Sequence, residues 1–133
     1  MKINLTTSLL IFISSLIPTA VSAQHSSAKI YYLGWEVLTR TQASEDYVRK
    51  NNLIYVEIND WAYADRLHRL IRRMPCLEKR KIETLNTRIV IDFYIGEKMK
   101  IFQGDRLGLT INGKLCRYTP EFFTEVNFLK FPK

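Results

Sequence analysis

Residues 88–118 alternate short apolar runs with glycine-containing turn signals, and this pattern constrains the fold more than any other part of the chain. Three turn signals follow one another: Gly96-Glu97-Lys98, Gly104-Asp105-Arg106 and Asn112-Gly113. Short strands separated by turns of this length pair as consecutive antiparallel hairpins. The pattern therefore predicts a four-stranded antiparallel β-meander over about residues 88–118.

The apolar residues of the meander predict its register, because one face of the sheet must cover a core. Three-residue turns at the first two signals set Phe93 opposite Ile101, and Ile101 opposite Leu109. A two-residue first turn would instead place Phe93 opposite Lys100, which is a poorer match. The Asn-Gly turn sets Leu109 opposite Cys116. Cys116 is therefore expected on the inner, apolar face.

Helical periodicity is clearest over about residues 60–74, where apolar side chains recur at three- and four-residue spacing. A threonine and a proline at the start of about residues 120–129 predict a C-terminal helix. Further N-terminal strands are expected within residues 30–37 and 53–58, whereas residues 77–86 have the composition of a charged connection. The fold class is α+β, with the meander packed against the two helices.

The first 23 residues have the pattern of a cleaved secretory signal peptide. Lys2 is their only charge, an apolar run follows, and Val21-Ser22-Ala23 supplies small residues for cleavage near Ala23. The apolar run is too short for a membrane span of about 20 residues. An uncleaved anchor is the alternative. Residues 24–133 are then expected to form a single domain, periplasmic or secreted, without a transmembrane segment.

The chain has two cysteines, Cys76 and Cys116. In an oxidising compartment two cysteines most simply form one disulfide. Closing the loop between them stabilises the fold by about 3–4 kcal/mol in the chain-entropy model. Two separate buried thiols are the alternative, and the wide spacing does not favour a metal site. The disulfide would join the end of the long helix to the inner face of the sheet.

Motifs for catalysis or metal binding are lacking in the sequence, which contains no HExxH, GxSxG, P-loop or CxxC pattern. No catalytic residue, metal ligand or cofactor is therefore predicted. His68 is expected to be a packed or surface histidine. Asp92 is expected on the outer face of the sheet, in an ion pair with Lys100. A small hydrolase that uses His68 or carboxylates remains an alternative.

A basic cluster is the sharpest positive feature of a chain whose formal net charge is +7. Within residues 66–81 only Glu78 opposes the positive charges. Such a surface attracts an anionic partner and speeds association. The alternative is a helix face that is only solvated. The predicted partner-binding residues are Arg66, Arg69, Arg72, Arg73, Lys79, Arg80 and Lys81.

The expected partner is a protein with an acidic surface. Anionic lipid or lipopolysaccharide is an alternative, and nucleic acid is not expected outside the cytoplasm. In size, compartment and lack of catalytic motifs, the chain resembles small disulfide-bonded periplasmic inhibitors and immunity proteins. The resemblance implies a protein that is not an enzyme and neutralises a toxin, bacteriocin or enzyme by binding it. A periplasmic accessory protein or chaperone, a sensor partner of a membrane protein and a small exported hydrolase are alternatives.

Overall fold

The computed structural model describes residues 25–80 and 85–129, apart from the side chain of Glu78. The predicted signal peptide and Lys81 lie outside the described residues. The elements in chain order are β1 (Ser26–Tyr32), α2 (Glu45–Asn51), β2 (Ile54–Ile58), α3 (Trp61–Arg72), β3 (Cys76–Lys79), β4 (Ile89–Ile95), β5 (Lys98–Gly104), β6 (Gly108–Ile111), β7 (Lys114–Arg117) and α4 (Pro120–Glu125).

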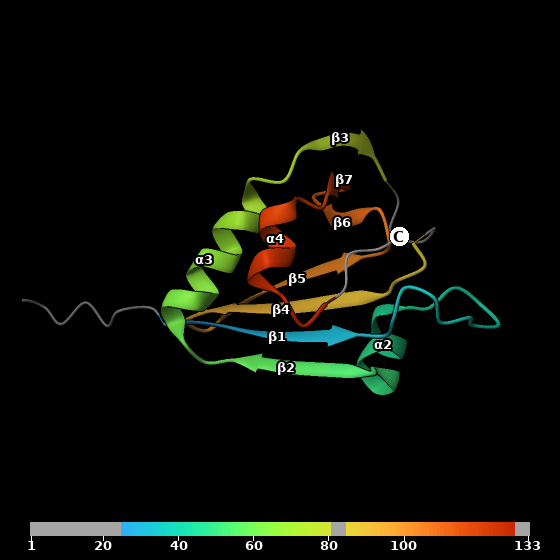
Figure 1. Cartoon of the computed structure of the whole chain (residues 1–133), viewed down its shortest axis with the longest axis horizontal. Helices are drawn as coiled ribbons and strands as arrows, with labels where there is room; N and C mark the ends of the chain where they lie inside the picture. The colour runs from blue at the N-terminus through green and yellow to red at the C-terminus, as the bar shows by residue number, and fades with distance from the viewer. Residues whose placement is uncertain (1–24, 81–84, 130–133) are drawn as a thin grey trace, which may run out of the picture.

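One seven-stranded antiparallel sheet organises the fold, in the order β2-β1-β4-β5-β6-β7-β3 (Figure 1). Strands β4 to β7 are the predicted meander. The N-terminal strands β1 and β2 extend the sheet beside β4. The α+β fold class is confirmed, with β2 and β3 as the two edges of the sheet.

Both faces of the interior strand β4 are buried along most of its length, so it has apolar residues at consecutive positions. Ile91 and Phe93 belong to the main core, together with buried side chains from α3 and α4. Val90 points to the other face and joins a smaller core with Val48 of α2. The two helices of the main core lie next to each other on one side of the sheet (Figure 1). The fold therefore has a helical layer on each face.

The two helices of the main core begin at capping residues. Asp60 precedes α3 and accepts hydrogen bonds from the backbone N–H groups of Ala62 and Tyr63. Thr119 caps α4 in the same way, and Pro120 is its first residue. These side chains pair N–H groups that the first turn of a helix leaves without partners. The predicted C-terminal helix is shorter than expected, since α4 ends at Glu125.

The predicted register of the first hairpin is wrong. Phe93 pairs with Lys100, and Ile95 pairs with Lys98 across a two-residue turn. Gly96 has a φ of 60°, which suits the first central position of a two-residue type II′ turn. Turn geometry therefore outweighs the apolar match, and Ile101 lies on the outer face. Lys98 and Lys100 take the inner-face positions of β5.

The predicted register of the second hairpin is also wrong, because Gly104, not Ile101, pairs with Leu109. Gly108 starts β6 very close to β7. A Cβ atom at this position would lie 2.1 Å from the backbone oxygen of Cys116. Only glycine allows this approach, and the connection between β5 and β6 is residues 105–107, one position later than the predicted turn.

The third hairpin has the predicted register, with Leu109 opposite Cys116. Asn112 and Gly113 both have positive φ values, 51° and 73°, as a type I′ turn requires. Two other segments differ from expectation. Residues 76–79 form the edge strand β3 at the start of the predicted charged connection, and β1 begins at Ser26, before the strand segment predicted within residues 30–37.

Asp92 lies on the outer face as predicted, but its ion-pair partner is Arg49 and not Lys100. Arg49 Nη2 lies 2.6 Å from Asp92 Oδ1, and Arg49 Nε donates to Asp92 Oδ2 at 3.1 Å. Helix α2 covers this face of β4 and brings Arg49 over the carboxylate. Asp92 is only 4 % exposed. Because a buried carboxylate is costly without a charged partner, this pair holds α2 on the sheet.

None of the helices within residues 25–80 and 85–129 combines the length and apolar character that a membrane crossing needs.

Candidate functional site

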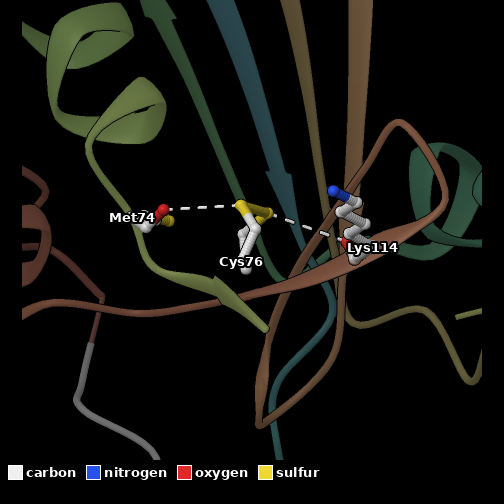
Figure 2. Close-up of a disulfide and its surroundings, with 4 residues drawn as sticks. Met74, Cys76 and Lys114 are labelled. Carbon is white, nitrogen blue, oxygen red and sulfur yellow. Dashed lines mark hydrogen bonds between the residues drawn. A yellow bond between two sulfur atoms is a disulfide. The ribbon is translucent and has the colours of Figure 1, made fainter. Parts of the chain in front are cut away.

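A disulfide joins Cys76 at the start of β3 to Cys116 of β7, as predicted. The two residues are directly opposite each other in the sheet. Cys116 is completely buried in the main core, whereas Cys76 is exposed. Figure 2 shows the sulfur atoms between two backbone carbonyls, with Cys76 Sγ 3.4 Å from Met74 O and Cys116 Sγ 3.7 Å from Lys114 O. The disulfide thus attaches the chain that leaves α3 to the inner face of the sheet.

A groove of about 630 Å³ lies beside this disulfide, and Cys76 forms part of its wall. Four elements meet there: the C-terminal half of α3, the start of β3, the middle of β5 and the end of β6. A volume of this size is typical of ligand-binding clefts. The walls of the groove include His68 and Arg72 from α3, Lys100, Ile101 and Phe102 from β5, and Ile111 at the end of β6.

The groove is positively charged. Arg72 and Lys100 come from different elements, and neither forms an ion pair with another residue in the described part of the chain. Both affect His68, which stacks on Phe93 with ring centroids 4.7 Å apart. Burial, with the charges of Lys100 and Arg72, lowers the pKa of His68, and Asp65 opposes the shift. The groove therefore has two cations without an ion-pair partner in the described part of the chain, beside a histidine whose pKa is lowered.

Thr110, which pairs with Gln103 of β5, also lines the groove. Its hydroxyl is buried and has no hydrogen-bond partner among residues 25–80 and 85–129. Buried polar atoms in proteins nearly always have a partner. This wall of the groove therefore has hydrogen-bonding capacity that the described fold leaves unused.

The other predicted residues of α3 lie away from the groove. Arg66, Arg69 and Arg73 line a smaller pocket of about 300 Å³ with Glu125 of α4. Arg66 Nε donates to Glu125 Oε1 at 3.0 Å. Arg69 Nη2 lies 3.7 Å from Asp65 Oδ2. The structure therefore divides the predicted helical patch between two surfaces, with Arg72 on one and the other three arginines on the second.

The residues predicted after α3 are also separated. Lys79 is exposed at the end of β3. Arg80 pairs with Asp105, to whose Oδ1 its Nη1 donates at 3.2 Å, and both side chains are mostly buried. Lys81 lies outside the described residues. Arg80 thus has a structural partner, and Lys79 is the exposed cation of this segment.

A catalytic pair of His68 and Asp92 does not form. His68 packs against the main core from α3, whereas Asp92 lies on the opposite face of the sheet and pairs with Arg49. In the described part of the chain, no group of three His, Cys, Asp or Glu side chains is placed to hold a metal ion.

Lys100 belongs to this groove, although the sequence pattern did not predict it on this face of the sheet. The predicted register placed it on the outer face beside Asp92, and its inner-face position follows from the two-residue turn at Gly96. A signal was present, because a glycine followed by one residue is a common two-residue hairpin turn. A lysine on an otherwise apolar face breaks the expected pattern, and such departures are typical of functional sites.

Comparisons with protein-family models, with curated proteins and with solved structures found no match for this chain.

Proposed function

We propose that this protein is exported to the periplasm and acts there as a binding module of the immunity or inhibitor type. It neutralises a partner protein, such as a toxin, bacteriocin or enzyme, by covering part of its surface. The observation that carries the proposal is that Arg72 and Lys100 share one groove without an ion-pair partner among the described residues.

Two further features support the proposal. The first 23 residues have the pattern of a signal peptide, and a disulfide suits an oxidising compartment. Arg69 and Arg73 extend the positive surface along α3 beyond the groove. Exposed charges around a contact mainly set the association rate and the selectivity for a partner of opposite charge. The partner surface is therefore acidic.

The test is partner capture from periplasmic extract, using the purified, oxidised protein as bait. The double variant Arg69→Glu with Arg73→Glu reverses two charges on α3. The matched control, Arg40→Glu with Lys50→Glu, makes the same charge change at exposed positions outside α3. We expect the α3 variant to capture at least about tenfold less partner, the control to capture as much as the wild type, and added salt to weaken capture.

Equal capture by the α3 variant and the control would refute the role of this surface. The identity of the captured protein separates two kinds of binding function. A soluble toxin or enzyme whose activity falls on binding supports the proposal. Co-purification with an inner-membrane protein would instead favour an accessory or sensor-partner role.

A further inference from the structure

One edge of β5 is largely unpaired. On one side β5 pairs with β4 along its whole length, from Lys98 to Gly104. On the other side, its pairing with β6 is confined to Gln103 and Gly104 in the described chain. Alternate backbone N–H and C=O groups of residues 98–102 therefore point away from β4 with no strand beside them.

The groove follows this unpaired edge. Lys100, Ile101 and Phe102 all line it, although successive side chains of a strand point to opposite faces. Three consecutive residues can share one groove only where it runs along the edge of the strand. Ile111, at the end of β6, lies on the other side of the gap. Figure 1 shows the short β6 beside only part of the longer β5.

The charge of the groove and its apolar walls both suit an extended peptide with acidic and apolar side chains. Arg72 and Lys100 attract carboxylates, whereas Ile101, Phe102 and Ile111 offer apolar contacts between and beside them. A free phosphate or a lipid headgroup would use the charges but not the strand edge. An extended peptide uses both, because its backbone pairs with the edge while alternate side chains reach the walls.

We propose that the unpaired edge of β5 receives an extended acidic segment of the partner protein, which adds to the sheet as a further strand between β5 and the end of β6. The inference rests on the proposed protein-binding function and specifies how it is carried out. Arg72 and Lys100 bind the carboxylates of the segment, and residues 98–102 supply the backbone hydrogen bonds.

The test uses a blocked hexapeptide of alternating valine and glutamate, titrated into the oxidised protein and followed by NMR. We expect chemical-shift changes at residues 98–102 and slower hydrogen exchange of their outward-facing amides. Lys100→Glu should weaken binding about tenfold or more. The control Lys50→Glu makes the same charge change on α2, across the sheet, and should leave binding unchanged.

Four further probes make the test decisive. A peptide with glutamine in place of glutamate should lose the charge contacts and bind at least about tenfold more weakly. A peptide methylated on alternate backbone nitrogens loses the donors that strand pairing needs and should bind equally poorly. Inorganic phosphate and phosphatidylglycerol vesicles should not slow exchange in residues 98–102. Equal binding by the methylated peptide, or equal protection by phosphate or vesicles, would overturn strand addition.

Failure of this inference is distinguishable from failure of the proposed function. If Arg69→Glu with Arg73→Glu abolishes partner capture while Lys100→Glu leaves it intact, the binding function stands and the β5 edge is not the site. If the hexapeptide binds as expected but no partner depends on α3, the β5 site stands and the proposed use of α3 fails.

Discussion

Lys100 shows how one residue can change the character of a surface. Its neighbour across the strands is Phe93, a core residue that is completely buried. The cost of a lysine at this position is limited because the groove is open and the ammonium group stays exposed. With Arg72, it turns an apolar face of the sheet into an anion-binding one.

His68 predicts a pH dependence that can be measured. Burial and the nearby charges of Lys100 and Arg72 lower its pKa, with Asp65 opposing, so the folded protein favours the neutral imidazole more than the unfolded chain does. As the pH falls through about 6.5, the unfolded chain binds a proton on this side chain more readily than the folded protein does. We therefore expect the contribution of His68 to stability to be complete above this pH and to decline as the pH falls.

The measurement compares the thermal midpoints of the wild type and His68→Phe between pH 7.5 and pH 5. The substitution keeps a ring over Phe93, with which His68 stacks, and removes the titrating group. The wild type should lose more stability over this interval than the variant. Identical pH slopes for the two proteins would contradict the prediction.

At the scale of elements, β3 illustrates how pairing can create a strand where the sequence has no strand pattern. Its four residues come from a charged segment, and their strand neighbour is β7. Leu77 is largely exposed, so burial contributes little to holding the strand in place. The disulfide between Cys76 and Cys116 attaches it instead.

Replacing both cysteines, Cys76→Ser with Cys116→Ser, should therefore destabilise the fold strongly. The disulfide closes a loop with a sequence separation of 40, and its loss should lower the free energy of unfolding by about 3–4 kcal/mol. Urea denaturation of the oxidised wild type and the variant measures the difference. Wild type kept reduced is the control and should resemble the variant. A loss below about 1 kcal/mol would contradict the expected contribution of the loop.

At the scale of the whole molecule, the two faces of the sheet are covered differently. On one face α2 is held by Arg49, whose pKa is raised by its hydrogen bonds with Asp92. On the other face α3 and α4 leave the groove open beside the main core. The proposed partner would therefore bind on the side of α3 and β5, and the side of α2 serves stability.

Export is a prediction about the whole chain. Expressed in a bacterial host with residues 1–23 present, the protein should be recovered from the periplasm with Gln24 as its first residue. Ala23→Leu places a bulky side chain where a signal peptidase requires a small one, so this variant should keep its leader. N-terminal sequencing and mass spectrometry measure both outcomes. An intact N-terminus on wild-type protein in the cytoplasm would refute export and cleavage.

The sequence by itself determined the types of most elements, the disulfide and the Asn112-Gly113 turn. Helical and strand periodicities are local properties, and two cysteines allow only one intramolecular pairing. Only the tertiary structure decided the registers of the first two hairpins, and with them the position of Lys100. They depend on turn geometry at Gly96 and on the close approach of Gly108 to Cys116. Sequence periodicity does not record such contacts between distant backbones.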